Sequence, residues 1–258
     1  MYVDTHTHLF TDAFDDDRDT VVQRAIDAGV EYLLLPNIDG GTIEAMLNLE
    51  AKFPEHCFSM MGLHPGSVNE TWEEELAKVK EHLFSRKYTA VGEIGMDLYW
   101  DKTFVEEQRK AFCQQVEWAK ELQLPIAIHA REAFDEIFSI LDEINDDRLT
   151  GVFHCFTGNI DQARHIEAYG GFKLGIGGVV TYKKAAMDQV LEHVDLNHLI
   201  LETDSPYLSP VPFRGKRNES SYLLHIAEKL SDIYGVPLKE IEETTTKNAI
   251  ELFNLTVK

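Results

Sequence analysis

Short apolar runs alternate along the chain with longer segments in which apolar residues recur every three or four positions. The short runs are rich in Val, Ile, Leu and Phe and are mostly bounded by Gly, Pro or charged residues, which is typical of buried β-strands. The longer segments have the periodicity of amphipathic helices. We expect eight strands, over residues 3–9, 31–36, 57–64, 88–95, 125–130, 151–156, 171–178 and 199–205.

Helical patterns fill the intervals between these runs. Thr71 is followed three residues later by Glu74, the spacing of a capping box that begins a helix. Gly29 follows another periodic segment and favours a helix end there. We expect helices over residues 17–29, 71–85 and 105–124, and two closing helices within 237–255.

Eight strand–helix alternations in 258 residues leave roughly 28 residues between strand starts, which fits a (β/α)8 TIM barrel of the α/β class. A doubly wound open sheet is the alternative. No GxGxxG follows the first run, and the glycines of residues 175–178 lack the context of a nucleotide-binding turn. Because no repeat, linker or low-complexity segment interrupts the pattern, we expect one domain over residues 1–258.

The composition narrows the class of protein. A formal net charge of -21 argues against broad electrostatic binding to a long nucleic acid, so a phosphate substrate needs metal ions or a local basic patch. No apolar run approaches the ~18 residues of a membrane span. Three residues before Asp4 leave no room for a signal peptide, and three cysteines without CxxC spacing fit a reducing compartment. We expect a cytoplasmic protein without membrane contact or obligate protein partner.

Ionisable residues lie where the predicted strands end, the face that carries the active site of such a barrel. His6 and His8 are two residues apart, so a strand would point both to one side, with Asp4 on the same face. Each residue alone is readily explained as a hydrogen-bonded structural group. Together, unpaired buried charges would cost several kcal/mol per ion, which bound metals would offset. The set comprises His6, His8, His64, Glu93, His129, Arg131, His154, Glu202 and Asp204.

Four imidazoles and two carboxylates make a mixed nitrogen and oxygen site, suited to Zn, Mn, Fe or Co and passably to Mg. Six side-chain ligands are too many for one metal that keeps an open position, but they fit two metals about 4 Å apart that share a carboxylate. We expect Glu93, central by strand order, to be the shared ligand. The others divide into His6, His8 and Asp204 at one metal, and His129 and His154 at the other.

Seven motifs resemble, in order and at family-like spacing from residue 3 to about 254, the TatD-like family of metal-dependent DNases within the amidohydrolase superfamily. They are VDTHTHL, GLHP, VGEIGMDLYW, IHARE, FHCFTG, LETDSPYL and TTKNAIELF. The resemblance implies a TIM barrel, two divalent metal ions (Zn, Mg or Mn) and hydrolysis of phosphodiester bonds in DNA. It carries over His6, His8, Glu93, His129, His154 and Asp204 as metal ligands, and places His64 and Arg131 near substrate phosphate.

The expected reaction is metal-assisted attack of water on phosphorus, with Glu93 and Asp204 as the catalytic carboxylates and Asp204 also as general base. The resemblance makes single-stranded DNA the expected partner and exonuclease action the expected mode, with RNA or D-aminoacyl-tRNA esters as substrates of some members. A hydrolase of ester or amide bonds is the first alternative. Such enzymes often bridge their metals with a carbamylated lysine, whereas this strand offers Glu93 and no lysine. A non-catalytic binding protein is the second alternative.

Several neighbours carry two interpretations. Arg131 is expected to clamp a phosphate, with an ion pair to Glu132 as the alternative. Tyr99 and Trp100 either stack on a base or pack the barrel rim. We expect Glu202 to support the ligands from behind and Cys155 to point into the core. The basic run of Arg214, Lys216 and Arg217 guides a phosphate backbone or is a solvated loop.

Overall fold

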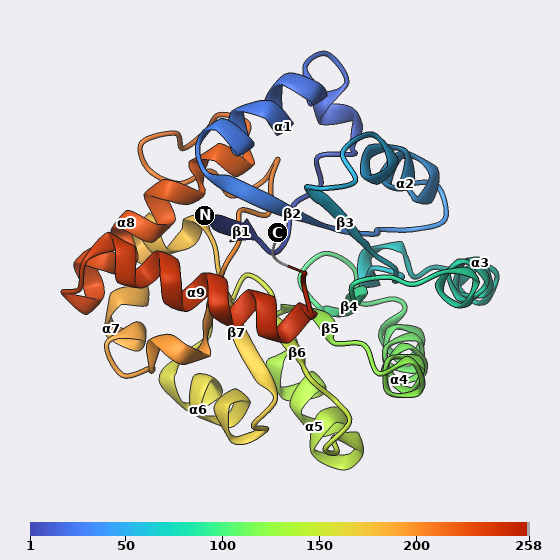
Figure 1. The fold of residues 1–258 in the computed structure, drawn as a ribbon. Helices are drawn as coiled ribbons and strands as arrows, with labels where there is room; N and C mark the ends of the chain where they lie inside the picture. Colours follow the sequence, from blue (N-terminus) through green and yellow to red (C-terminus); the bar gives the residue numbers. More distant parts are fainter. Residues whose placement is uncertain (257–258) are drawn as a thin grey trace.

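Eight parallel strands in chain order form a barrel in the computed structural model, which describes residues 1–256. Helices surround the strands on the outside (Figure 1). The predicted (β/α)8 class is confirmed. The strands are β1 (Tyr2–Asp4), β2 (Val30–Pro36), β3 (Cys57–Met60), β4 (Val91–Asp97), β5 (Ile126–Arg131), β6 (Gly151–Phe153), β7 (Phe172–Ile176) and β8 (Leu199–Leu201).

Two continuous ladders, β1 to β3 and β4 to β8, make up the wall. Backbone hydrogen bonds join them at both seams. Between β3 and β4, Met61 N–H donates to the Ala90 carbonyl at 3.1 Å, and between β1 and β8, Thr5 N–H donates to the Leu201 carbonyl at 3.0 Å. Since both seams are bonded, the sheet has no free edge and closes into a barrel.

The helices are α1 (Arg18–Asp27), α2 (Ile43–Lys52), α3 (Trp72–Ser85), α4 (Val105–Leu122), α5 (Phe134–Ile144), α6 (Ile160–Ala168), α7 (Met187–Leu191), α8 (Leu223–Tyr234) and α9 (Leu238–Phe253). Two predictions are wrong. The segment 237–255 holds one helix, α9, because its buried residues recur at helical spacing from Ile241 to Phe253. The capping box at α3 is absent because the Thr71 hydroxyl donates to Asn69 Oδ1, while Asn159 and Gln162 form one at α6.

The helix α9 covers the end of the barrel at which the strands begin, and crosses that opening in Figure 1. Its residues Ala249 and Phe253 pack into the apolar interior. The Asn248 amide donates to the carbonyls of Leu196 and Leu199, at 3.1 and 2.8 Å, which fixes α9 beside β8. The site must therefore lie at the opposite end.

No helix within residues 1–256 is long and apolar enough to cross a membrane. The barrel interior consists of Val3, Tyr32, Leu34, Met60, Ala90, Ala127, Val152 and Ile200.

Candidate active site

His6 and His8 lie beyond the first strand, so the prediction that a strand carries them is wrong. β1 ends at Asp4, and an extended segment continues between β2 and the loop after β8. Thr7 N–H donates to the Leu34 carbonyl at 3.0 Å, and His8 N–H donates to the Ser205 carbonyl at 2.7 Å. These bonds hold the backbone extended, and the two imidazoles still converge, with 3.3 Å between their Nε2 atoms.

Asp4 does not join the two histidines. Its Oδ1 accepts hydrogen bonds from the backbone N–H of His6 and of Thr203, at 3.3 and 2.9 Å, and its Oδ2 accepts from the Thr203 hydroxyl at 2.6 Å. Burial raises the pKa of Asp4 to about 7 against the lowering effect of these bonds. Asp4 therefore ties the segment after β8 to the segment that carries His6 and His8.

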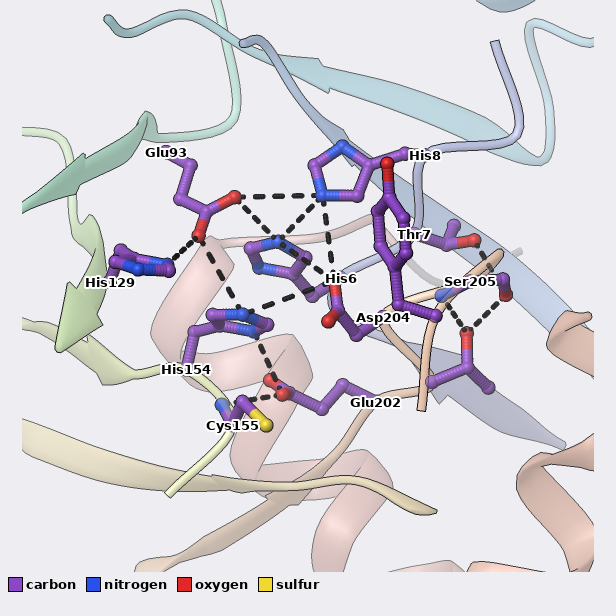
Figure 2. A network of polar contacts seen from close by, with 12 residues as sticks. His6, Thr7, His8, Glu93, His129, His154, Cys155, Glu202, Asp204 and Ser205 are labelled. Carbon is purple, nitrogen blue, oxygen red and sulfur yellow. Dashed lines mark hydrogen bonds and ion pairs between the residues drawn. The ribbon is translucent and has the colours of Figure 1, made fainter. Parts of the chain in front are cut away.

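Glu93, from β4, lies at the centre of the cluster and is 2% exposed. Its Oε2 is 3.0 Å from His6 Nε2 and 3.5 Å from His8 Nε2. Its Oε1 is 2.9 Å from His129 Nδ1 and 3.6 Å from His154 Nε2. The two carboxylate oxygens thus face two separate sets of imidazole nitrogens (Figure 2).

Asp204 completes the first set from the segment after β8. Its Oδ1 is 3.5 Å from His8 Nε2, 3.9 Å from His6 Nε2 and 4.0 Å from His154 Nε2. The backbone of Asp204 has a φ of 57°, a left-handed conformation that is costly for a residue with a side chain. Such strain is typical of positions where a functional side chain must point in one direction.

The donor sets fit divalent metal ions. Atoms that share a metal at about 2.1 Å lie roughly 3–3.5 Å apart in a tetrahedral shell, close to the spacings between His6, His8 and Glu93. Within residues 1–256, three groups bring their ligand atoms within 4.8 Å of one another, namely His6 with His8 and Glu93, His6 with His154 and Glu202, and His64 with Glu93 and His129. Imidazole nitrogen with carboxylate oxygen is a ligand set for Zn or Mn.

Two further carboxylates orient the imidazoles of the second set. Asp97 Oδ2 is 2.9 Å from His129 Nε2, which favours a proton there and leaves the Nδ1 lone pair toward Glu93. Glu202 Oε1 is 2.8 Å from His154 Nδ1, although out of line for a straight hydrogen bond. Its negative charge favours a proton on Nδ1, so the Nε2 lone pair of His154 also faces Glu93.

His64 follows β3, and its ring nitrogens have different roles. Its Nδ1 accepts a hydrogen bond from Gly66 N–H at 2.9 Å, so the ring proton of neutral His64 lies on Nε2. That Nε2 is 3.5 Å from Glu93 Oε1 and 3.3 Å from His129 Nδ1. Burial lowers the pKa of His64 to about 3, so the ring is neutral. It therefore presents a hydrogen-bond donor beside the second set.

The ionisation of the cluster depends on its internal contacts. Burial alone would raise the pKa of Glu93, but the surrounding imidazoles of His6, His64, His154 and His129 hold it well below its usual range. Burial opposes charge on His154 as well, yet Glu202, Glu93 and Asp204 raise its pKa to about 10, so a metal ion at its Nε2 would displace a proton there. Glu93 is therefore ionised at neutral pH and available to a cation.

A cavity of about 580 Å³ opens above the cluster. A second cavity of about 240 Å³ adjoins it, and shares His129, Arg131, His154, Asp204 and Leu208 with it. Cys155 lines this second cavity, so the prediction that it points into the core is wrong. The reason is a left-handed backbone, with φ of 46°, which breaks the alternation of a strand. At the mouth of the larger cavity lie Ile38, Gly66, Trp100, Arg131, Tyr207 and Leu208.

Arg131 extends over two aromatic rings at the cavity mouth. Its guanidinium carbon is 4.0 Å from the ring centre of Tyr99 and 5.1 Å from that of Trp100. No carboxylate of residues 1–256 lies within ion-pair distance of Arg131, so the alternative pairing with Glu132 is wrong. Trp100 is 75% exposed, which excludes packing against the rim. The guanidinium remains available to an anion.

The predicted basic run divides into two parts. Arg217 forms a two-point ion pair with Asp17, at 2.8 Å for each contact, and is a structural residue. Arg214 instead stacks on Tyr182, with its guanidinium carbon 4.0 Å from the ring centre. Arg217 is therefore not available to guide a phosphate backbone. For Arg214 and Lys216, that role stays a prediction.

Glu202 depends on a glycine in the neighbouring strand. Glu202 is fully buried, and its Oε1 accepts a hydrogen bond from Cys155 N–H at 2.6 Å. A Cβ atom on Gly175 of β7 would lie 2.2 Å from Glu202 Oε2, closer than non-bonded atoms approach. Glu202 was expected to support the ligands, whereas Asp97 is a residue that the sequence analysis missed. Its spacing of four from Glu93, on one face of β4, was an available signal.

Comparisons with known proteins agree with this geometry. The family model described as TatD related DNase matches residues 3–254. The chain is 37% identical to an uncharacterized metal-dependent hydrolase, YabD, of Bacillus subtilis, over 99% of this chain and 100% of that protein. It is 32% identical to the 3′-5′ ssDNA/RNA exonuclease TatD of Pectobacterium carotovorum, over 98% of this chain and 99% of that one.

A solved structure extends the likeness to the fold. The crystal structure of YjjV, a TatD homologue from Escherichia coli K12, superimposes with a TM-score of 0.92 at 31% identity, covering 99% of this chain and 98% of that one. The match of the family model over nearly the whole chain, the relatives above 30% identity and the His/Glu clusters able to hold metal ions agree with one another. The chain therefore belongs to the TatD-related DNase family of metal-dependent hydrolases.

Proposed function

We propose that the chain is a two-metal exonuclease that hydrolyses phosphodiester bonds of single-stranded DNA. The observation that carries this proposal is the position of Glu93, whose two oxygens face separate donor sets. When bound, divalent ions such as Zn, Mg or Mn activate water for attack and neutralise charge on the phosphoryl oxygens. One ion would be held by His6, His8, Glu93 and Asp204, and the other by Glu93, His129 and His154.

Asp204 is the carboxylate placed to accept the proton of the attacking water. Its side chain is 14% exposed and lines both cavities, whereas Glu93 and Glu202 are 2% and 0% exposed. Water that enters from solvent therefore meets Asp204 before the other two carboxylates. A base must lie within hydrogen-bond reach of the proton it removes, and this exposure favours Asp204 as general base.

Arg131 and His64 are the donors that would bind the scissile phosphate. The unpaired guanidinium of Arg131 offers two parallel N–H groups, a geometry that matches phosphate. His64 presents Nε2–H at the same cavity. Both donors line the cavity that Glu93 also lines, so a phosphate bound between them would face the two donor sets.

Two exposed aromatic residues favour a nucleic-acid substrate over a small ester. Trp100 follows β4 and Tyr207 follows β8, on opposite sides of an eight-stranded barrel, and they are 75% and 53% exposed. Exposed rings of this kind stack on bases. The likeness to a relative named as a 3′-5′ ssDNA/RNA exonuclease supports action at a strand end.

The test is incubation of metal-loaded protein with end-labelled single-stranded DNA, with Mg, Mn, Co and Zn in turn. We expect stepwise shortening by the wild type and a loss of at least about 10³-fold in Glu93→Ala, because both donor sets lose their shared carboxylate. Glu228→Ala, which removes an exposed carboxylate from α8, serves as control. If DNA and RNA both remain intact with every metal, the nuclease proposal is wrong. Aminoacyl-tRNA esters and small amides are then the substrates to assay.

A further inference from the structure

Five cations gather on the loops after β7 and β8 and on the adjacent helix α8. None of them lies within ion-pair distance of a carboxylate of residues 1–256. In a chain with a net charge of -21, five unpaired cations on adjoining segments make a local basic surface. The five are Lys183, Lys184, Arg214, Lys216 and Lys229.

Tyr182 lies at the centre of this basic surface and connects its two loops. The Arg214 guanidinium stacks on its ring at 4.0 Å, and the Tyr182 hydroxyl donates to the Ser209 carbonyl at 2.8 Å. A further bond joins the loops, from Val211 N–H to the Thr181 hydroxyl at 2.9 Å. The cations are thus carried on loops held in one arrangement, which reduces the entropy lost when an anion binds.

A cavity of about 230 Å³ lies beside Tyr182 and is lined by Lys183 and Lys229. Asp188 is the one carboxylate on its wall among the described residues, so the two ammonium groups outnumber it. Liquid water occupies about 30 Å³ per molecule, so the cavity has room for a phosphate group with several waters. Its charge and size suit a solvated phosphodiester, the repeating unit of a nucleic-acid backbone.

The loop after β7 connects this basic surface with the active site. Val179 and Leu208 line the cavity that also contains Arg131 and Asp204, and the next residue after Val179 begins the wall of the lysine cavity. We propose that the surface binds the phosphates of the nucleic-acid strand outside the active site, with Lys183, Arg214 and Lys229 as the contacts. The inference rests on the proposed function and specifies the path of the strand beyond the scissile bond.

The test measures binding apart from hydrolysis. A fluorescein-labelled phosphorothioate oligonucleotide of about 20 nucleotides, which resists cleavage, is titrated with metal-loaded full-length protein and followed by anisotropy. The variant Lys183→Ala/Arg214→Ala/Lys229→Ala is expected to raise the Kd about tenfold near 0.1 M salt. The slope of log Kd against log salt should fall by about 2, since each phosphate contact on a single strand contributes about 0.7. Hydrolysis of bis(p-nitrophenyl) phosphate, too short to reach the surface, should not change.

The control removes three positive charges elsewhere, as Lys110→Ala/Lys239→Ala/Lys247→Ala, and should leave the Kd within about twofold of wild type. Equal weakening by both triple variants, unchanged binding by the first, or no binding by wild type would each overturn the inference. Failure of the proposed function gives a different result. Wild type would then bind the oligonucleotide through these residues but hydrolyse neither DNA nor bis(p-nitrophenyl) phosphate.

Discussion

The two ends of the barrel are built from the same eight strands but carry opposite kinds of surface. At the closed end, α9 buries Ala249 and Phe253 against the interior, and the exposed lysines on α9 lie next to glutamates. At the open end, Arg131 and Arg214 stack on aromatic rings without a carboxylate partner, and Trp100 lies in solvent. At the closed end the side chains are paired or packed within the protein. At the open end, unpaired guanidinium groups and an exposed aromatic ring are available to a ligand.

The backbone shows the same contrast. Five non-glycine residues in the loops that follow β5 to β8 adopt left-handed φ angles between 46° and 57°, namely Glu132, Cys155, Ala186, Asp204 and Leu208. Two others, Gln123 and Asn254, are ordinary helix C-caps of α4 and α9. A left-handed conformation costs about 1–2 kcal/mol per residue. We infer that packing at the closed end offsets the backbone strain that positions functional groups at the open end.

The largest effect on stability should come from the closed end. Phe253→Ala removes a side chain that is 3% exposed and leaves a cavity between α9 and the barrel interior. We expect the free energy of unfolding to fall by about 3–5 kcal/mol, measured in urea, with kcat and KM unchanged at temperatures where the variant is folded. Glu251→Ala, an exposed change on the same helix, should cost less than about 0.5 kcal/mol. A changed KM in folded Phe253→Ala would show that the two ends are coupled.

A smaller effect, on activity alone, should follow a change behind the site. Glu202→Gln keeps the size of the side chain above Gly175 but removes the charge that favours a proton on His154 Nδ1. We expect metal affinity or kcat to fall about 10–100-fold, because groups behind metal ligands act through them. Metal titration and kinetics measure this, with Glu228→Gln as the exposed control. Unaltered metal affinity and kcat would show that Glu202 only fills space.

The smallest effect concerns the loop that leads from the open end to α8. Glu219 is buried, which tends to raise its pKa, but hydrogen bonds from Arg24 at 3.0 and 2.6 Å hold the pKa below its usual 4.5. A lowered carboxylate pKa gives stability that is present above about pH 4.5 and is lost as pH falls through the folded-state value. We expect the free energy of unfolding of the wild type to exceed that of Glu219→Gln by about 1 kcal/mol at pH 7. The difference is small because Arg24 is partly exposed, so solvent screens the ion pair.

Urea unfolding at a series of pH values measures this difference. It should shrink steadily below pH 4.5 and disappear once Glu219 is protonated in the folded chain. Glu243→Gln, on the exposed face of α9, should show no such trend. A difference between wild type and Glu219→Gln that does not depend on pH would mean that shape, not charge, holds this loop.

The sequence predicted the existence of every strand because burial on both faces leaves continuous apolar runs. Strand ends were less predictable. The alternation rule applies only while the ladder continues, and β6 ends at Phe153, so it failed for Cys155. His6 and His8 converge as expected, but through bonds to β2 and to the loop after β8. Such bonds join residues far apart in the chain and have no local pattern.

Asp97 was missed for a related reason. Its contact with His129 depends on the register of β4 against β5, in which Gly95 pairs with His129 and Asp97 with Arg131. Gly95 has a φ of 143°, and a Cβ there would lie 2.0 Å from the His129 carbonyl oxygen, so only glycine allows this approach. The register is a property of two strands together, whereas periodicity describes one strand at a time.

The space that Gly175 leaves for Glu202 has a consequence for how this chain can change over generations. A single methyl group at position 175 would lie 2.2 Å from Glu202 Oε2, too close for both to be present without a shift. The two positions are therefore expected to change together during evolution, because an alanine at 175 and a glutamate at 202 do not fit in the same structure. Gly175→Ala should damage the enzyme from a strand that contributes no ligand, and Gly175→Ala/Glu202→Ala should recover the folding stability that the first change removes, without recovering the activity.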